Sequence, residues 1–226
     1  MNPISIHTET VYYHDIPALA DASVRTVLAV RHSIRESLRG GTIDPSLTEE
    51  GVALARKCGK ELSGLGDDVS FGASPRLRTR QTAQYMIEGG GFRAGTVMDC
   101  PALVDMAIFE TTADLAEMLR TRSTEPALRQ YYATGHADGL KDVKPFSEEL
   151  LHSLTETRFE TDRTVLVTHD VLIMAVLSAL GVRQFTPEDW CGYLHGVLLT
   201  LDGAGAWTAS YAVPDHDRGK TYRLFV

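Results

Sequence analysis

The sequence predicts a single α/β domain with a mostly parallel sheet and helices on both faces. Three short runs of branched aliphatic residues indicate buried strands, over residues 25–30, 69–73 and 164–168. Strands that are covered on both faces usually belong to parallel sheets, and stretches with helical periodicity follow each of these runs. A chain of 226 residues is long enough to form one such domain with a substantial core.

The first strand follows an N-terminal stretch, residues 1–23, that shows no strong period and is expected to pack as an extension on the main domain. A glycine-containing loop then leads to the first helix. Thr48 is a preferred N-cap residue for that helix. Glu49 and Glu50 follow in the first turn, where the helix dipole favours acids, and Gly51 begins a series of small and apolar residues at steps of three and four.

The second strand leads into a helix over about 77–87, which three consecutive glycines are expected to end. The stretch from 101 to about 163 is longer than a simple crossover needs. Pieces with helical pattern, separated by turn residues, occupy it over 115–119, 127–132 and 146–159. The stretch is interpreted as a helical insertion that lies over the carboxyl ends of the strands and forms part of the substrate pocket.

The third strand leads into an apolar helix over 171–180, and the tail contains three strand-like pieces, over 196–201, 207–213 and 222–226. No repeat, low-complexity tract or clear linker divides the chain. Residues 1–226 are therefore expected to form one unit.

Charge and cysteine usage narrow the class of protein. A net charge of −8 argues against a nucleic-acid or membrane-surface partner, so local groups of arginines favour a small anionic ligand. Cys58, Cys100 and Cys191 form no CxxC or zinc pattern, which favours free thiols in a reducing compartment. No signal-peptide pattern is visible and the longest apolar stretch is too short to span a bilayer, so a cytoplasmic location is expected.

The residues that follow the three strands carry the chemistry. Arg31 and His32 follow the first strand, Arg78 lies shortly after the second, and His169 and Asp170 follow the third. Ligands of open α/β sheets bind beyond the carboxyl ends of the parallel strands, so these side chains are expected to meet. Two imidazoles and several guanidinium groups suit an anion with tetrahedral oxygens, and phosphate is the obvious candidate.

Each residue type suggests a role. A neutral imidazole can attack phosphorus, so His32 is the candidate nucleophile, although an isolated histidine is more often tied to a backbone carbonyl in the core. Arg31, Arg35 and Arg78 are the candidate phosphate clamp, because a guanidinium grips two oxygens and keeps its charge. His169 is the candidate second imidazole that donates to a phosphate oxygen.

Asp170 has three possible roles: general acid for the leaving oxygen, N-cap of the following helix, or a group that orients a histidine. Two histidines and an aspartate could also bind a metal, but the surrounding arginines would repel it and no HExxH pattern is present. Nucleotide-binding loops are also missing from the sequence. We therefore expect neither a metal nor a cofactor.

Four segments, in this order, resemble the signature of the histidine phosphatase superfamily. This superfamily includes cofactor-dependent phosphoglycerate mutases and histidine acid phosphatases. The resemblance extends over about residues 25–180, and an RH pair alone would be weak evidence. The four segments are 31–35 (RHSIR), 47–51 (LTEEG), 74–83 (SPRLRTRQTA) and 167–169 (VTH).

The resemblance implies a phosphohistidine at His32. The same resemblance implies that Arg31, Arg35, Arg78 and His169 complete the phosphate pocket. Arg78 is chosen over Arg76 because it stands four residues after Ser74 and directly before Thr79. The family usually has glycine after the first histidine, and here the residue is Ser33.

The general acid differs between the two branches of the family. The mutase-like branch takes a glutamate from the segment after the second motif, where this chain offers Asp105, with Glu110 as a weaker option. The acid-phosphatase-like branch takes the aspartate after the second histidine, which matches Asp170. Asp170 is favoured over Asp105.

The expected function is hydrolysis of a phosphomonoester through a phosphohistidine, without metal. The expected partners are phosphate and a small, singly phosphorylated metabolite, because the insertion has no large cluster of basic residues. The alternatives are a phosphoglycerate mutase-like phosphotransferase and a non-catalytic phosphate-binding regulatory protein. The sequence leaves the ester and the oligomeric state open.

Overall fold

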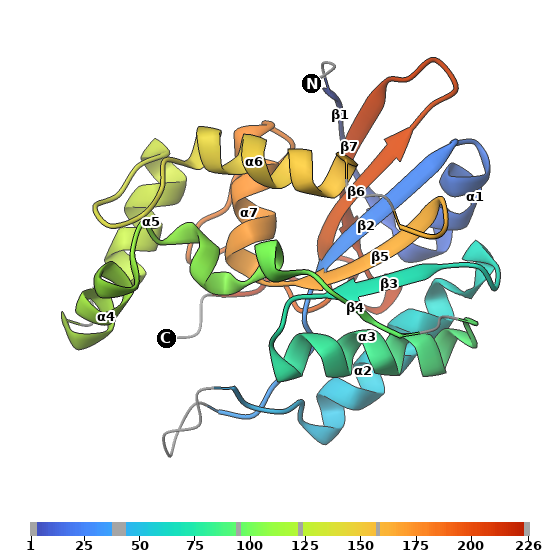
Figure 1. The fold of residues 1–226 in the computed structure, drawn as a ribbon, viewed down its shortest axis with the longest axis horizontal. Helices are drawn as coiled ribbons and strands as arrows, with labels where there is room; N and C mark the ends of the chain where they lie inside the picture. The colour runs from blue at the N-terminus through green and yellow to red at the C-terminus, as the bar shows by residue number, and fades with distance from the viewer. Residues whose placement is uncertain (1–3, 38–43, 94–95, 122–123, 157–158, 224–226) are drawn as a thin grey trace.

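A seven-stranded sheet forms the centre of the molecule (Figure 1). The computed structural model describes residues 4–37, 44–93, 96–121, 124–156 and 159–223. The strands lie in the order β1-β7-β6-β2-β5-β3-β4. β2, β5, β3 and β4 run parallel, and β1 is parallel to β7, whereas β6 is antiparallel to both of its neighbours. The prediction of a mostly parallel sheet is therefore confirmed. The strands are β1 (Ile4–Tyr12), β2 (Arg25–Arg31), β3 (Ser70–Ala73), β4 (Met98–Asp99), β5 (Arg163–Thr168), β6 (Gly196–Leu201) and β7 (Trp207–Val213).

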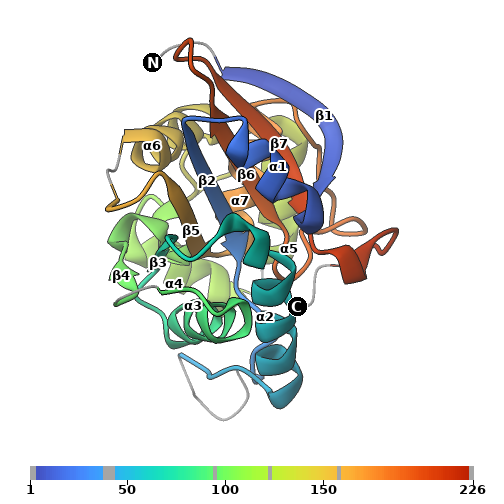
Figure 2. The ribbon, with the colours of Figure 1, turned by 90° about the vertical axis from the view of Figure 1, so that its right-hand side faces the viewer.

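Helices cover both faces of the sheet, as predicted. One face packs against α1, α2 and α3, and the other against α6 and α7 (Figures 1 and 2). Because side chains alternate along a strand, β2 contributes to both cores: Val27 and Ala29 belong to the α6–α7 side, and Leu28 and Val30 to the other. The helices are α1 (Ile16–Asp21), α2 (Glu49–Glu61), α3 (Leu77–Gly90), α4 (Thr112–Thr121), α5 (Thr124–Thr134), α6 (Val143–Glu156) and α7 (Asp170–Ala179).

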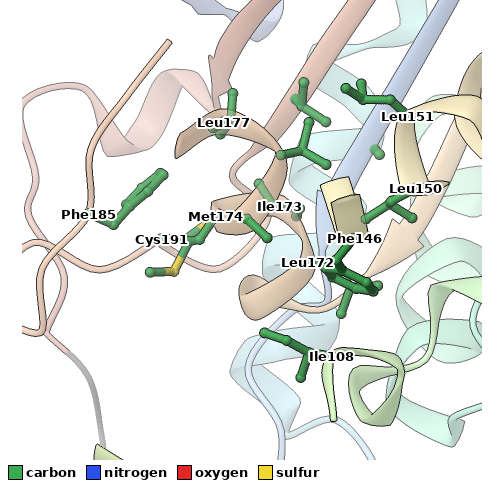
Figure 3. Close-up of a cluster of buried hydrophobic side chains, with 14 of the residues drawn as sticks. Ile108, Phe146, Leu150, Leu151, Leu172, Ile173, Met174, Leu177, Phe185 and Cys191 are labelled. Carbon is green, nitrogen blue, oxygen red and sulfur yellow. The ribbon is translucent and has the colours of Figure 1, made fainter. Parts of the chain in front are cut away.

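The helix α7 has no polar face in its sequence, because apolar residues of the core on the α6–α7 side surround it. Figure 3 shows Leu172 and Ile173 of α7 with Phe146 and Leu150 of α6, and all four side chains are buried. A helix that is hydrophobic on every side is one that other elements enclose. The sheet encloses α7 on one side, and α6 and the insertion enclose it on the others.

Glycines bring α2 and α3 into close contact. A Cβ atom on Gly59 would lie 2.0 Å from the carbonyl oxygen of Met86, and one on Gly89 would lie 2.0 Å from the carbonyl oxygen of Arg56. Gly89 and Gly90 therefore belong to the helix, which continues past the predicted end at about residue 87 and stops within the glycine run, as predicted. α3 ends at Gly91, whose left-handed φ of 69° is the usual conformation of a glycine C-cap.

The edges of the sheet were not predicted. The N-terminal stretch forms β1 and α1, and most β1 residues are exposed or half-buried, so no alternation of buried residues reveals the strand. β4 is only two residues long. At the other end of the chain, the predicted strand over 222–226 is wrong where the structure describes it, since Tyr222 forms only an isolated bridge to Trp190. Residues 224–226 lie outside the described residues.

The stretch interpreted as an insertion has two kinds of contact. α6 packs on α7 and serves as a crossover helix, while α4 and α5 lie beyond α7, away from the sheet (Figure 1). The strand ends are met by two short 3₁₀ helices, η3 (Pro101–Leu103) and η4 (Asp105–Ile108), and the Thr168 hydroxyl donates to the Leu103 carbonyl at 2.8 Å. In the described part of the chain, none of the helices has the length and apolar character needed to cross a membrane.

Candidate active site

Three neighbouring parallel strands, β2, β5 and β3, end at the same edge of the sheet. Arg31 is the last residue of β2, Ser74 follows β3, and His169 follows β5. The backbone keeps these ends in register, because the His32 amide donates to the Thr168 carbonyl and the Ser74 amide donates to the Val167 carbonyl. The structure therefore brings together the polar residues that the sequence places after the three strands.

His32 lies at the centre of this group. Its ring is buried and lies 5.5 Å from the ring of His169, at an angle of 67°. Nδ1 lies 2.7 Å from the Ser33 carbonyl oxygen, which can only accept, so Nδ1 carries the proton and Nε2 keeps its lone pair. Burial, followed by the nearby His169, Arg31 and Arg78, lowers the pKa of His32 well below its usual value. The ring is thus neutral and has a free nucleophilic nitrogen.

His169 is held by two residues of the second motif. Its Nδ1 lies 3.3 Å from Arg78 Nη2, which can only donate, so the ring proton is on Nε2, 2.9 Å from the Ser74 hydroxyl oxygen. Burial lowers the pKa of His169 to about 4. The charge of Asp105 opposes this shift, and the charge of Arg78 adds to it. His169 occupies the N-cap position of α7, but its ring makes no capping bond.

Two buried arginines, Arg31 and Arg78, flank the histidines. Arg31 Nη1 donates to the Cys191 carbonyl, and its guanidinium lies 4.1 Å from the centre of the Tyr193 ring. Arg78 donates from Nη1 to Asp44 Oδ1 at 3.3 Å. The Nε atoms of both arginines are buried and find no hydrogen-bond acceptor among the described residues. Unsatisfied buried donors are rare in native proteins, and a bound anion would supply acceptors for them.

The other arginines near the site are less buried. Arg35 is half-buried and donates to the Glu36 carbonyl at 2.9 Å. Burial, with help from the charges of Arg35 and Arg76, lowers the pKa of Arg78 despite the opposing effect of Asp105, so Arg35 lies within electrostatic reach of the pocket. Arg80 is exposed and pairs with Asp99 at 2.8 Å, as expected for a solvated residue.

Two aspartates reach the pocket, each against a different buried arginine. Asp105 Oδ2 lies 2.6 Å from Arg78 Nη2 and 3.9 Å from His169 Nδ1, and Oδ1 accepts from Arg76. Burial opposes ionisation, but His169, Arg78 and Arg76 outweigh it and lower the pKa of Asp105. The Asp105 side chain remains 31% exposed, so a substrate leaving group can reach it.

Asp170 lies against the other arginine. Its Oδ2 accepts from the Trp190 indole at 2.8 Å and lies 3.1 Å from Arg31 Nη2, while Oδ1 accepts from the Val171 amide. Burial raises the pKa of Asp170, but Arg31 and Trp190 outweigh it and lower the pKa below its usual value. Asp170 is the first residue of α7, not its N-cap. Glu110 is exposed and follows η4.

Ser33 braces the loop that carries His32. Its hydroxyl donates to the Gly51 carbonyl at 2.7 Å, and its amide donates to the Thr82 hydroxyl at 3.0 Å. Gly51 is needed at this contact, because a Cβ there would lie 2.0 Å from the Ile34 carbonyl oxygen. A serine in place of the usual glycine is therefore accommodated by a hydrogen bond to α2.

The sequence analysis missed three residues of the site: Asp44, Trp190 and Tyr193. Tyr193 lies 6.1 Å from the ring of His32 and precedes Leu194, which has a left-handed φ of 64°. A positive φ is unusual for leucine and marks a backbone that the surrounding structure holds in place. Trp190 and Tyr193 lie far along the chain from His32, and Asp44 lies in the loop after it, where no local pattern in the sequence indicates its contact with Arg78.

The site and fold can be compared with known proteins. The family model of the histidine phosphatase superfamily (branch 1) matches residues 27–191. A search of curated proteins finds no match.

Three solved structures have a similar fold at low identity. A phosphoglycerate mutase from Bacillus anthracis is 18% identical, with a TM-score of 0.53, over 85% of this chain and 94% of that one. A mycobacterial glucosyl-3-phosphoglycerate phosphatase in complex with VO3 is 20% identical, with a TM-score of 0.52, over 83% and 98%. A mutant phosphoserine phosphatase from Entamoeba histolytica is 16% identical, with a TM-score of 0.50, over 82% and 94%. With four ordered motifs meeting at one sheet edge and a family model that matches most of its length, this chain belongs to the histidine phosphatase superfamily.

Proposed function

We propose that this protein is a phosphatase that hydrolyses a small, singly phosphorylated metabolite through a phosphohistidine at His32, with no metal in the chemical step. The observation that carries this proposal is the state of His32. Its ring is neutral, its Nδ1 proton is tied to the Ser33 carbonyl, and its Nε2 shares a pocket with His169 and two buried arginines. A phosphoryl group placed there meets a nucleophile and fixed positive charge together.

In the first step, His32 Nε2 attacks phosphorus and the bond to the ester oxygen breaks. Arg31 and Arg78 stabilise the charge on the equatorial oxygens, and the His169 ring, 5.5 Å from the ring of His32, lies beside the transferred group. The products of this step are phosphohistidine and the alcohol, once the departing alkoxide has received a proton.

Asp105 is the better placed proton donor. Its carboxylate lies on Arg78 and near His169, at the exposed side of the pocket, whereas Asp170 is occupied by Arg31 and the Trp190 indole. A bound phosphate dianion would offset the charge of Arg78 and thereby raise the pKa of Asp105, which favours its protonated form. The sequence favoured Asp170, and the geometry leads us to propose Asp105 for this role, with Asp170 as the group that orients Arg31.

In the second step, water replaces the alcohol. The Asp105 carboxylate takes a proton from that water, the oxygen attacks phosphorus, and the electrons of the P–N bond return to His32 Nε2. Phosphate leaves, and both His32 and Asp105 are back in their starting states. The same residue therefore acts as acid in one step and as base in the next.

The charges of the pocket suit one phosphate group. The described cations are Arg31, Arg35, Arg76 and Arg78, and the described acids are Asp44, Asp105 and Asp170. Their formal charges sum to one positive charge when both histidines are neutral. A pocket with this balance attracts a phosphate monoester but lacks the excess of cations that several phosphate groups would need.

The decisive experiment is to trap the phosphoenzyme. Turnover of a ³²P-labelled ester, quenched rapidly without acid, should leave label on the peptide that contains His32. The label should wash out in acid and persist in alkali, because the P–N bond is acid-labile. His32→Ala should abolish labelling and turnover while the circular dichroism spectrum stays unchanged, and His169→Ala should slow turnover but still permit label at His32.

Three outcomes separate the alternatives. Label on His169, or full activity of His32→Ala, would overturn the assignment of the nucleophile. Transfer of the label to a second phosphorylated metabolite faster than to water would indicate a mutase. Binding of phosphate by the wild-type protein with neither label nor turnover, over a panel of metabolite esters, would indicate a regulatory protein.

Metal removal and vanadate give a second test. The cations of the clamp are arginines, so hydrolysis of an aryl phosphate should survive excess EDTA. Vanadate should inhibit, because it adopts the trigonal-bipyramidal geometry that the clamp is proposed to stabilise. Activity that disappears in EDTA and returns with a divalent ion would contradict a metal-free chemical step.

A further inference from the structure

A second polar cluster lies between α2 and the short 3₁₀ helix η5 (Asp215–Asp217), outside the phosphate pocket. Within the part of the chain that the structure describes, one group of His, Cys, Asp or Glu side chains has the spacing of metal ligands: Cys58, Glu61 and His216. Their ligand atoms all lie within 4.8 Å of one another. Cys58 and Glu61 stand three residues apart on α2, so they project from the same side of the helix.

The distances approach those of a bound ion. His216 Nδ1 lies 3.2 Å from Glu61 Oε1. Ligand atoms around a tetrahedral zinc ion are about 3.3–3.7 Å apart, since each lies about 2.0–2.3 Å from the metal. The His216 Nε2 atom faces Asp217 Oδ1 at 3.7 Å, which resembles the carboxylate that commonly orients a metal-bound imidazole.

The burial and charge of the cluster favour a cation. The Cys58 side chain is fully buried, and the Glu61 and His216 side chains are only 14% and 10% exposed. Two further acidic residues adjoin them: the Asp217 carboxylate lies beside His216, and the backbone amide of Asp215 donates to Glu61 Oε2 at 3.1 Å. Among the described residues, Lys220 is the one lysine or arginine that forms an ion pair with any of these three acids, and histidines provide their remaining ion-pair partners.

We propose that Cys58, Glu61 and His216 bind Zn²⁺, or a divalent ion of similar ligand preference, as a structural site that holds η5 on α2. On binding, the Cys58 thiol releases its proton to solvent, and the thiolate sulfur, a Glu61 oxygen and the neutral His216 Nδ1 each donate an electron pair. Water completes the tetrahedron. A mixed sulfur, nitrogen and oxygen set is typical of zinc and disfavours Mg²⁺ and Ca²⁺, which prefer oxygen alone.

This site would stabilise the fold and take no part in the chemical step. Among the described residues its ligands do not contact the pocket residues directly: Asp217 contacts His195, whose carbonyl accepts from the Arg31 amide, and α2 also carries Gly51, whose carbonyl accepts from Ser33. The inference is therefore independent of the proposed phosphatase activity. Removal of the ion should loosen η5 and lower the melting temperature, while hydrolysis measured well below that temperature should continue.

The test uses Zn²⁺ and Co²⁺ with the full chain. The protein is stripped of metal and incubated with Zn²⁺, and about one equivalent of Zn²⁺ should then stay bound through gel filtration. With Co²⁺ it should show a thiolate-to-cobalt charge-transfer band in the near ultraviolet. Free Zn²⁺ at a hundred times its dissociation constant should raise the melting temperature by roughly 5–10 °C. Cys58→Ser should lose the cobalt band and most of the thermal shift, and Cys191→Ser and Cys100→Ser, which alter the other two thiols, should keep both.

A second variant and three results decide whether the zinc site exists. If Cys58→Ser does not fold, His216→Gln, at a more accessible position, should weaken Zn²⁺ binding at least tenfold and serves the same purpose. Failure of the wild-type protein to retain Zn²⁺ would overturn the proposal. A cobalt–thiolate band that persists in Cys58→Ser, or zinc affinity that is unchanged in His216→Gln, would overturn it equally.

Discussion

Two arginine–aspartate pairs flank the pocket histidines, and they differ in what surrounds the acid. Asp170 lies against Arg31, accepts from the Trp190 indole and begins a helix that is enclosed in the core. Asp105 lies against Arg78 on a short 3₁₀ helix, and its partners are two arginines with an exposed edge. The Asp170 carboxylate accepts from an indole as well as lying against an arginine, and its side chain is 20% exposed. The Asp105 carboxylate accepts from Arg76 and Arg78, and its side chain is 31% exposed.

The comparison shows how one pair of residue types can serve two roles. A carboxylate whose two oxygens both accept from the protein, as those of Asp170 do from the Val171 amide and the Trp190 indole, must break those bonds to exchange a proton with a substrate. Such a group is suited to holding a guanidinium in place. A carboxylate that is partly exposed and paired mainly with cations responds to the charge of a bound ligand. Local environment, not residue type or position in the motif, therefore separates the proposed acid from the orienting group.

The largest expected effect tests this comparison directly. Asp105→Asn should slow hydrolysis of an alkyl phosphate by roughly a hundredfold to ten-thousandfold, yet slow an aryl phosphate far less, because only the alkoxide needs a proton as it departs. Asp170→Asn should slow both esters by similar factors, since it disturbs Arg31. The measurement is kcat/KM on the two esters for both variants. If Asp170→Asn shows the selective loss instead, the roles of the two aspartates are reversed.

The next effect concerns Arg78, the buried arginine that pairs with Asp105. Arg78→Ala should lower kcat/KM by roughly a hundredfold to a thousandfold, in line with the loss of one preorganised donor to the transition state. Arg80→Ala, two residues further along α3, is the matched control, and its activity should be close to that of the wild type. Were the two variants to behave the other way round, the second motif would be aligned incorrectly.

A third prediction uses pH to examine His169, which lies beside Arg78. Folding lowers the pKa of His169 from 6.5 to about 4, so below pH 6.5 the unfolded chain binds a proton that the native state does not. The free energy of unfolding is therefore unaffected by His169 above pH 6.5. It falls as the pH drops from 6.5 towards 4, and the decrease due to His169 is about 2 kcal/mol by pH 5. His169→Gln should remove this part of the pH dependence.

Urea unfolding at pH 7.5, 6 and 5 measures this effect. His152→Gln, at an exposed position on α6, is the control and should follow the wild-type pH profile. Equal pH profiles for the wild type and His169→Gln would show that His169 is not buried in its neutral form.

The smallest expected effect concerns the contact between Tyr193 and Arg31, the arginine that pairs with Asp170. Tyr193 supports the Arg31 guanidinium through its ring face, a contact worth about 0.5–1 kcal/mol. Tyr193→Leu should therefore lower kcat/KM only about twofold to fivefold, and Tyr193→Phe, which keeps the ring, should be nearly silent. A hundredfold loss in Tyr193→Phe would mean that the hydroxyl takes part in catalysis.

The elements that were predicted correctly from the sequence are those that depend on interactions between residues close together in the chain. β6 and β7 were predicted with their observed bounds, and Thr48 caps α2 as expected, because apolar runs and caps depend on neighbouring residues. β1 and β4 were missed because an exposed strand and a two-residue strand have no pattern of their own. α3 continues past the predicted end at about residue 87 to Gly90, because close packing against α2 favours residues without side chains there, and it stops at Gly91.

The sequence by itself determined the α/β class, the three strand ends and the residue types that meet there. Each of these follows from local periodicity and from the rule that parallel strands end at one edge. Only the tertiary structure decided which nitrogen of each pocket histidine carries the proton, and which donors surround each aspartate. These properties depend on contacts such as Trp190 with Asp170, and Asp105 with Arg78, between segments that are distant in the chain. Burial and hydrogen bonding set the state of a titratable group, and both exist only once the chain has folded.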